Sequence, residues 1–455
     1  MGPGIDAPNG KPSYFRGEWI PAGDERYDAA RQGIFNTRFD PRPPAVARCL
    51  GNADVAAALA YAREHGHEVS VRSTGWSLAG FSSTDGLVID LSLMRGVRVD
   101  PAARTAWIQG GVMGGDLQIE VARHGLAAST GMLSGTGVGL ILGGGIGHLS
   151  RRAGYASDNV LAVELVTAAG EVVTASPEEN PDLFWAVRGT MGNFGVVTAL
   201  KVKLHEVPPL VLAGALTWTG PRAQQALRAL AEVVEWGSDD FNVLGMMAPE
   251  TTTIWFCHSG PPEVAKEEVA RLTSFADPDD GEVEEIPFRD LTFVHDEEYP
   301  PLRALMEEEV VKDLDDDLIA LLEERVGMPL PEGSEGAWMA EISPRYRALS
   351  RAPEHPSAVH PGPAEPCWTI VPGAWWTDAA EDAAHIGWVE ESCAAVRDRV
   401  GAFGLAQPNG IGRQVDAARL AEVYGEGFQR LRELKRRWDP DNVFRANLNI
   451  EPAAD

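Results

Sequence analysis

The sequence predicts an α+β protein of two domains, and three observations support this prediction. The chain has 455 residues, of which 44% are apolar and 23% charged, so it has the composition of a globular protein and is too long for one simple core. Segments that alternate like strands are interspersed with segments of helical spacing. The run Glu206-Val207-Pro208-Pro209 separates two halves of different texture, because consecutive prolines suit neither a helix nor a central strand.

Local patterns predict each element of the first half. Asn52 is the expected N-cap of the first helix, Asp54 lies in its first turn where the dipole favours an acid, and Gly66 would close it. In a later helix, Leu117, Val121 and Ile119 would face inward. In order, we expect an irregular lead-in with strands at most (1–40), a helix (53–65), strands (68–71 and 86–91), a strand pair (97–110), a helix (114–125), a hairpin (162–174), a short helix (180–189) and a strand (196–204).

The second half is expected to combine amphipathic helices with apolar strands. Its acidic stretch, with Glu307-Glu308-Glu309 and Asp315-Asp316-Asp317, is interpreted as the solvated face of a helix. The aromatic strand 368–376 is interpreted as core, with the floor of a cavity for a large flat ligand as the functional alternative. In order, we expect a helix (222–236), a strand (251–257), helices (262–275 and 306–325), a loop (351–366), the aromatic strand (368–376) and a helix (424–438).

Charge and composition exclude several classes of function. The formal net charge is −28, from 39 basic and 67 acidic residues, which argues against nucleic acids and anionic membranes as partners. No apolar run is long enough to span a membrane, and the start of the chain lacks the pattern of a secretory signal. Four widely spaced cysteines predict free thiols and a cytoplasmic location. The histidines form no metal-binding pattern, and neither HExxH nor GxxxxGK[ST] occurs, so we expect no metal.

Two glycine-rich stretches are the candidate ligand-binding loops. The first, 71–81, follows a strand, and its small residues would expose backbone N–H groups to an anion, with Arg72 as a bidentate partner for phosphate. The second covers 130–147. Neither contains a strict GxGxxG between a strand and a helix, which disfavours a nicotinamide-binding fold.

These loops belong to a set of motifs that resembles flavoproteins of the berberine-bridge-enzyme type, in the vanillyl-alcohol-oxidase superfamily. Residues 72–77 are similar to the family's Arg-Gly-Gly-Gly-His-Ser pyrophosphate loop. The resemblance covers roughly residues 16–207 and 335–450. The other motifs that carry it are LGGGIG (142–147), YASDN (155–159), NPDLFWA (180–186), GNFGVV (192–197) and WDPDNVFRANLNI (438–450).

The resemblance implies a PCMH-type FAD-binding domain made of residues 1–207 and 401–455. Residues 208–400 would then form a substrate domain with an antiparallel sheet backed by helices. FAD and a small-molecule substrate are the implied ligands. The residues expected to contact FAD are Arg72, Ser73, Thr74, Gly75, Trp76, Ser77, Thr130, Ser134, Gly135, Thr136, Gly139, Gly143, Gly144, Gly147, His148, Gly195, Val196, Val197, Asn447 and Asn449.

Three departures from the family pattern affect the expected chemistry. Trp76 stands where the family has the histidine that bonds to flavin, and no cysteine lies near 132–134, so the FAD is expected to be noncovalent. The family's Tyr-x-Asn-Tyr/Phe segment aligns with Phe403-Gly404-Leu405-Ala406, which lacks the usual tyrosine base. Another base is required, and His148, His258 and Tyr346 are unranked candidates, so the catalytic residue stays unassigned.

Together these features predict an FAD-dependent oxidoreductase of specialised metabolism (natural product biosynthesis). It would transfer hydride from a bulky, partly aromatic molecule to flavin N5, with reoxidation by oxygen. One alternative is a redox-neutral cyclisation, isomerisation or elimination in which flavin is only a wall of the pocket. The other is a noncatalytic relative that has lost FAD. Neither the substrate nor the oligomeric state follows from the sequence.

Overall fold

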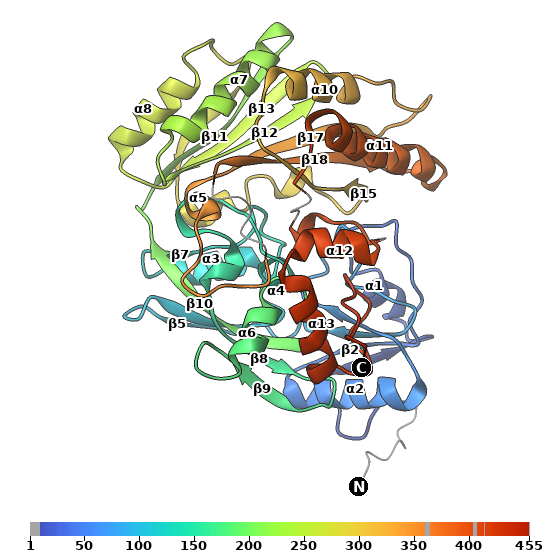
Figure 1. Cartoon of the computed structure of the whole chain (residues 1–455). Coiled ribbons are helices and arrows are strands. Elements are labelled where there is room, and N and C mark those ends of the chain that lie inside the picture. The colour runs from blue at the N-terminus through green and yellow to red at the C-terminus, as the bar shows by residue number, and fades with distance from the viewer. Residues whose placement is uncertain (1–9, 360–364, 404–406, 414, 455) are drawn as a thin grey trace.

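The computed structural model describes residues 10–359, 365–403, 407–413 and 415–454. Three sheets organise it. In the orientation of Figure 1, the first two sheets lie in the lower part, and the third lies in the upper part beneath a layer of helices. The chain passes from the lower to the upper part between Glu206, where β10 ends, and Val211, where β11 begins. This is the segment whose two prolines marked the expected boundary.

The first sheet has the strand order β1-β2-β4-β3, with parallel pairing of β4 to both β2 and β3. One helix, α2, covers it, because Val55, Ala58 and Leu59 recur at helical spacing and pack against apolar residues of the strands. This part contains β1 (Glu18–Pro21), α1 (Tyr27–Arg31), β2 (Ala45–Arg48), α2 (Asn52–His65), β3 (Val69–Arg72) and β4 (Leu87–Asp90).

The second sheet has the order β5-β6-β10-β8-β9, and β7 pairs with the far end of β10. Its long central strand, β10, alternates buried and less buried residues and forms part of the largest core of the lower half. This part contains β5 (Val97–Asp100), β6 (Thr105–Gln109), α3 (Gly114–Ala122), β7 (Leu126–Ala128), α4 (Val138–Leu142), α5 (Ser150–Ala153), β8 (Val160–Val166), β9 (Val172–Ala175), α6 (Pro181–Val187) and β10 (Val196–Glu206).

The third sheet is eight-stranded and antiparallel, in the order β14-β11-β13-β12-β17-β18-β15, with β16 also paired to β18. Helices α7, α10 and α11 cover one face (Figure 1). This part contains β11 (Val211–Thr219), α7 (Pro221–Trp236), β12 (Phe241–Ala248), β13 (Thr251–His258), α8 (Pro262–Leu272), β14 (Asp280–Ile286), α9 (Phe288–Leu291), β15 (Arg303–Met306), β16 (Glu309–Val311), α10 (Asp316–Val326), β17 (Ala337–Arg345), β18 (Cys367–Trp376) and α11 (Asp382–Val400).

After α11 the chain returns to the lower part as α12 (Ala417–Tyr424) and α13 (Gly427–Trp438) (Figure 1). A buried ion pair fixes this return: the Lys435 ammonium lies 2.8 Å from the Asp439 carboxylate and donates to the carbonyls of Asn193 and Phe444. Since both charges are fully buried, their mutual pairing and these hydrogen bonds are what make the arrangement tolerable.

The structure confirms most predicted elements and corrects several. The lead-in contains a short helix, α1. The N-cap of α2 is Gly51, because the Asn52 side chain donates to Glu164 instead. Ile119 is 45% exposed and does not face inward. The expected helix 424–438 is confined to α13, because Gly425 has a positive φ and separates it from α12.

The acidic stretch 306–325 is the largest correction. It is not one solvated helix: β15, β16 and α10 share it, and only α10 begins as expected, with Asp315 as its N-cap. Glu308 and Glu309 are almost completely buried. Arginines from distant parts of the chain neutralise them, Arg345 on Glu308 and both Arg397 and Arg419 on Glu309. Glutamates can be buried when they are paired in this way.

Candidate functional site

A cavity of about 210 Å³ opens in the lower part, beside the seam where the first two sheets meet the third sheet. We call it the main cavity. Its lining consists of Val69, Val71, 73–79, Phe81, Ser82, Leu91, Gly110, 137–140, Leu142, Met191, Gly192, Gly195, Val197, Pro408, Asn409, Phe444, Ala446 and Asn447.

The first glycine-rich loop forms one wall of the main cavity, as predicted for Ser73, Thr74, Gly75, Trp76 and Ser77. Gly75 needs to be glycine, because its φ is +86° and a Cβ would lie 2.3 Å from the carbonyl oxygen of Gly33. Ser73 anchors the loop by donating to the carbonyl of Gly110 at 2.6 Å. Within the described chain, the backbone N–H groups of 74–77 donate to no protein acceptor. Such a group of free donors suits an anionic ligand.

Trp76 is held firmly at this wall. Its indole stacks on Phe35 with a centroid distance of 4.0 Å and an interplanar angle of 21°. A Cβ on Gly135 would lie 3.1 Å from the same indole, so the second glycine stretch approaches Trp76 closely. An indole carbon cannot form the nitrogen–carbon bond that an imidazole can. The position is therefore occupied by a rigid aromatic wall rather than by a nucleophilic ring nitrogen.

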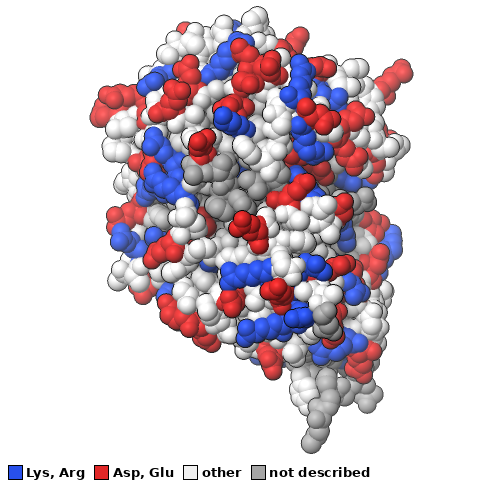
Figure 2. Space-filling model, in the orientation of Figure 1, with Lys and Arg blue, Asp and Glu red and all other residues white. Residues whose placement is uncertain are grey.

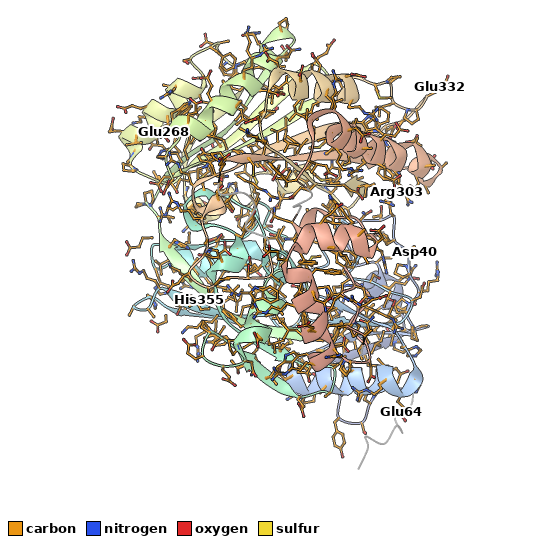
Figure 3. All side chains as sticks on the ribbon, viewed as in Figure 1. Asp40, Glu64, Glu268, Arg303, Glu332 and His355 are labelled. Atoms are coloured by element: carbon orange, nitrogen blue, oxygen red, sulfur yellow. The ribbon has the colours of Figure 1, made fainter. Side chains whose placement is uncertain are left out.

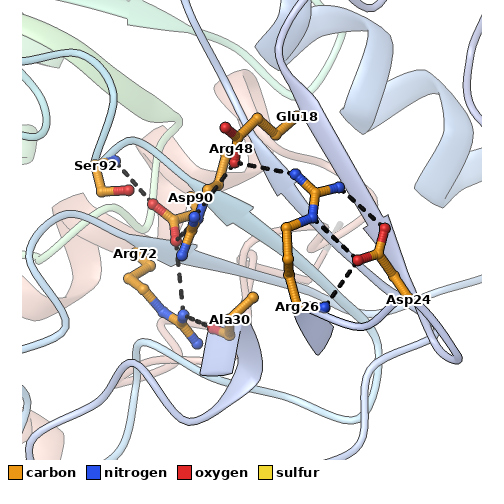
Figure 4. Close-up of polar contacts among 8 residues, drawn as sticks. All are labelled: Glu18, Asp24, Arg26, Ala30, Arg48, Arg72, Asp90 and Ser92. Atoms are coloured by element: carbon orange, nitrogen blue, oxygen red, sulfur yellow. Dashed lines mark hydrogen bonds and ion pairs between the residues drawn. The ribbon is translucent and has the colours of Figure 1, made fainter. Parts of the chain in front are cut away.

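Arg72 does not serve the cavity, which corrects its predicted role as a phosphate partner. Its guanidinium donates to the carbonyls of Ala30, Arg31 and Ser82, and lies 3.6 Å from the carboxylate of Asp90. Figure 4 shows the side chain directed toward Ala30 and Asp90. The parallel register of β3 and β4 places Arg72 beside Asp90. The residue is a buried structural tie between the loop and α1.

The second glycine-rich stretch contributes less of the lining than predicted. Gly139 lines the cavity, whereas the other residues predicted there lie outside its lining. Gly143 packs on the Asn409 side chain and Gly144 on Gln407, while Gly147 approaches a carbonyl so closely that a Cβ would lie 1.9 Å from its oxygen. Outside the lining of the main cavity lie Thr130, Ser134, Gly135, Thr136, Gly143, Gly144, Gly147 and His148.

The far end of the main cavity is apolar and closed by the C-terminal segment. Gly195 and Val197 line it as predicted, together with Phe444 and Asn447, whereas Val196 lies in the core behind the wall. Asn449 also lies outside the lining. The side-chain oxygen of Asn447 is buried and has no hydrogen-bond partner among the described residues. It is therefore available to a ligand N–H or O–H group.

The donor set of the main cavity fits FAD. None of its lining residues, all within the described ranges, carries a charge, so a pyrophosphate would be held by backbone N–H groups and hydroxyls rather than by arginine. The hydroxyl of Ser82 is also buried without a partner in the described chain. An apolar end suited to a purine, a donor-rich middle and an aromatic wall together match a dinucleotide with a flat ring system.

The sheet face that looks onto this region belongs to β17 and β18. Trp338, Ala340 and Ile342 pack into the helix-covered core, so strand alternation directs Met339 and Glu341 to the opposite face. The Trp375 indole donates to the Met339 sulfur at 3.0 Å, which places Trp375 on that same face. Trp375 from β18 lies edge-on to Phe35 from the lead-in, with ring centroids 6.0 Å apart, so this aromatic pair crosses the seam. Most of the aromatic strand packs in the core, as its first interpretation predicted, with Trp368, Ile370 and Trp376 in the helix-covered cluster. Its role as the floor of a ligand cavity stays a prediction.

Glu341 is the titratable group that stands out on this face. Burial, and to a smaller extent the nearby Glu308 carboxylate, raise the pKa of its carboxyl from 4.5 to about 7. Its carboxylate has no hydrogen-bond or ion-pair partner among the described residues. A carboxyl group that titrates near neutrality and is not otherwise engaged is suited to general-base chemistry.

A buried network links Glu341's neighbourhood to the wall of the main cavity. Glu308 pairs with Arg345 and accepts a hydrogen bond from the backbone N–H of Gln407 at 2.9 Å. The Gln407 side-chain oxygen accepts from the N–H of Gly145 at 3.1 Å, and the Asn409 amide donates to the carbonyl of Leu140. The segment 407–409 thus connects β16 to the second glycine stretch.

The three bases considered from the sequence are not placed at the main cavity. The Tyr346 hydroxyl is buried and donates to the carbonyl of Val233. His258 lies 3.1 Å from the Glu268 carboxylate, and Figure 3 shows Glu268 in the outer helix layer of the upper part, away from the seam. His148 lines a different cavity. Phe403 is 43% exposed, and residues 404–406 lie outside the described residues.

Sequence reasoning therefore missed Glu341, Gln407 and Asn409. A signal for Glu341 exists: it is a single acid inside the apolar strand Trp338–Ile342, where a charge is costly unless it has a function. No comparable signal marks Gln407 or Asn409, because their role depends on contacts with residues more than 250 positions away.

Other features of the surface and interior concern the ligands and partners considered from the sequence. Figure 2 shows acidic and basic side chains interspersed on the visible face, without a continuous basic stripe. The four cysteines are buried and free. Across the described ranges, no cluster of three or more His, Cys, Asp or Glu side chains could hold a metal ion. In the same ranges, no helix combines the length and apolar character needed to cross a membrane.

Comparisons with known proteins agree with this site. A family model described as FAD binding domain matches residues 43–176, and one described as Berberine and berberine like matches residues 413–451. The (R)-6-hydroxynicotine oxidase of Paenarthrobacter nicotinovorans is 34% identical over 97% of this chain and 98% of its own length. The crystal structure of 6-hydroxy-D-nicotine oxidase from Arthrobacter nicotinovorans has a TM-score of 0.86 and 31% identity, and covers 99% of this chain and 100% of the other.

A more distant structure shares the fold. The xylooligosaccharide oxidase of Myceliophthora thermophila has a TM-score of 0.83 at 24% identity, and covers 96% of this chain and 98% of the other. The mixed α and β architecture is thus shared along nearly the whole chain.

Proposed function

The chain belongs to the berberine-bridge-enzyme-like family of FAD-linked oxidoreductases, and we propose that it oxidises a bulky, partly aromatic small molecule with an FAD held without a covalent bond. The domain division 1–207, 208–400 and 401–455 and a role in natural product biosynthesis are parts of the same proposal. The observation that supports this proposal is the main cavity, whose uncharged lining combines free backbone N–H donors with the Trp76 indole.

Trp76 supports the noncovalent attachment. Among residues 73–77, the wall of the main cavity contains no histidine or cysteine side chain, and the stacked Phe35–Trp76 pair occupies the corner nearest the seam. Ser134, in the stretch where a linking cysteine was sought, uses its hydroxyl to hold the Asp296 carboxylate. FAD binding would then depend on shape and hydrogen bonding alone, so FAD should dissociate reversibly from the protein.

The proposed substrate lies in the seam between the main cavity and the exposed face of β17 and β18. Trp375 would support a flat ring there, and Tyr299, whose ring lies edge-on to Trp375 at 5.5 Å, would limit its extent. The relative named for 6-hydroxynicotine, similar along its entire length, supports an aromatic substrate that carries an oxidisable amine or alcohol.

Glu341 is the proposed catalytic base. FAD, when bound, supplies the acceptor for a hydride, and dioxygen takes up the two electrons afterwards. The carboxylate of Glu341 would accept the proton that the substrate's hydroxyl or amine loses as its carbon gives up hydride. Burial and Glu308 hold the pKa of Glu341 near 7, so an appreciable fraction is ionised at neutral pH while the basicity stays high.

The first test is a visible absorption spectrum of the freshly purified protein, repeated on supernatant and pellet after acid precipitation. Flavin colour in the supernatant is the expected result. Colour retained in the pellet would contradict noncovalent attachment. A colourless protein that regains no flavin band when FAD is added would contradict the use of FAD.

The second test separates oxidation from a redox-neutral reaction. Aromatic secondary amines and benzylic alcohols are offered to the FAD-loaded protein, and oxygen uptake is measured beside substrate loss. Stoichiometric oxygen uptake is expected. Substrate loss without oxygen uptake, and without bleaching of the flavin band under anaerobic conditions, would favour the redox-neutral alternative.

A further inference from the structure

A second cavity, of about 310 Å³, lies below the β14–β11–β13 end of the third sheet. We call it the side cavity, and its principal walls are His148, Ala213, Ala215, Asn242, Trp255 and His295. It shares no lining residue with the main cavity. The side cavity is therefore a separate space on the same side of the sheet.

The side cavity is a slot beside one flat aromatic wall. The Trp255 indole and the His295 imidazole stack in parallel to form this wall, with centroids 3.8 Å apart and an interplanar angle of 4°. Ala215 on β11 is the cross-strand neighbour of Trp255, and Ala213 lies on the same face of the strand. Small apolar residues beside an aromatic wall favour a planar aromatic ligand.

His148 supplies a specific polar group in this slot. The residue is 8% exposed, and its Nε2 atom is buried without a hydrogen-bond partner among the described residues. The imidazole hydrogen-bonds the backbone of Met132, and burial lowers its pKa to about 4. With Nδ1 engaged and the ring neutral at physiological pH, Nε2 carries a lone pair and is a hydrogen-bond acceptor.

We propose that the side cavity binds a flat aromatic molecule that carries one O–H or N–H group, which donates to Nε2 of His148. The ring lies beside Trp255 above the small residues of β11. Glu282 and Glu284, which also line this cavity, disfavour an anionic ligand and tolerate a neutral or cationic one. No proton or electron transfer is involved, and the site does not depend on the flavin.

The test uses two probes that differ only in the donor, 2-naphthol and 2-methoxynaphthalene, titrated calorimetrically into the FAD-loaded full chain. Naphthol is expected to bind about 10-fold more tightly than its methyl ether, the usual magnitude for one buried hydrogen bond. The variant His148→Phe keeps an aromatic ring and removes the acceptor, and should abolish this preference. The matched control His124→Phe alters an exposed histidine and should leave it intact.

A second variant keeps the proposal testable if His148→Phe does not fold. Ala215→Leu places a larger apolar side chain in the slot from another element, and should weaken both probes about 10-fold or more. Equal binding of the two probes to the unaltered protein would overturn the proposal. So would a preference for naphthol that survives in folded His148→Phe, or an affinity for both probes that Ala215→Leu leaves unchanged.

The visible flavin band distinguishes two sources of such a ring. If the band shifts with the same midpoint as the calorimetric titration, the ring reaches the flavin and represents part of a substrate. If binding leaves the band unchanged, the ring represents a separate molecule. Either result supports the site only when binding also depends on His148.

Discussion

Replacing Glu341 by glutamine should make the protein more stable and less active at once. The native pKa of Glu341 is about 7, against an ordinary value of 4.5. Between these values the folded state binds more protons than the unfolded state, so the free energy of unfolding falls as pH rises through this window. Above about pH 7 the ionised carboxylate exerts its full destabilising effect, which glutamine lacks.

The size of the effect follows from the shift. A difference between 4.5 and about 7 corresponds to roughly 3 kcal/mol at 1.36 kcal/mol per pKa unit. The Glu341 residue as a whole is only half-buried, so solvent screens part of this cost. We therefore expect Glu341→Gln to raise the free energy of unfolding by about 1–3 kcal/mol near pH 8 and to leave it unchanged near pH 4. Loss of the base should lower turnover by roughly 10²–10⁴-fold.

The assay is thermal unfolding of the FAD-loaded variant and parent at both pH values, together with the pH dependence of kcat/KM on a substrate found by the oxygen-uptake screen. For a chain of this length, 1 kcal/mol corresponds to a shift in Tm of about 1 °C. Glu285→Gln, on the exposed edge strand β14, is the matched control and should change neither quantity. The reasoning is refuted if Glu341→Gln is no more stable near pH 8, or if its rate still rises through about pH 7.

Three further predictions concern the cavity wall and the buried charges. A Cβ on Gly139 would meet no protein atom within 4 Å but would enter the main cavity. The variant Gly139→Ala should therefore fold normally and bind FAD about 10-fold or more weakly, as measured by equilibrium titration of the apoprotein. Arg72→Met should cost about 3–5 kcal/mol of stability in urea unfolding, because three carbonyls lose their donor and Asp90 loses one of its two arginine partners. The FAD affinity of the folded fraction should stay within about 3-fold, and a large selective loss of affinity would restore the predicted phosphate role of Arg72. Lys435→Met should cost about 3–5 kcal/mol of stability in urea unfolding, because it leaves Asp439 buried and unpaired. The double variant Lys435→Met/Asp439→Leu should recover part of that stability, and additive losses of stability would contradict the pairing.

Local sequence patterns were sufficient for most of the secondary structure. Gly66 ends α2 in a left-handed conformation, and the apolar spacing in α7 buries Leu227, Leu230 and Val233, because caps and amphipathic faces are determined by residues three or four positions apart. The sequence also placed the loop 73–77 correctly at a cavity, since small residues after a strand leave the backbone N–H groups exposed to a ligand.

Tertiary structure decided the charged groups. Arg72 was expected at a phosphate and instead binds carbonyls of α1, and Glu308 and Glu309 were expected in solvent and are buried against arginines. The position of a charged side chain depends on which partner the fold brings within a few ångströms, and those partners lie 37 to 110 positions away in the glutamate pairs.

The sequence by itself determined the family and the absence of the usual histidine at Trp76, and it predicted the loops that would bind FAD. Only the tertiary structure decided which side chains face the seam, where Phe35 from the lead-in contacts both Trp76 of the cavity wall and Trp375 of β18. It also decided that the carboxyl of Glu341 on β17 is buried near Glu308. The physical reason is that a pKa depends on burial and neighbouring charges, and these arise from packing one sheet against another part of the chain rather than from local spacing.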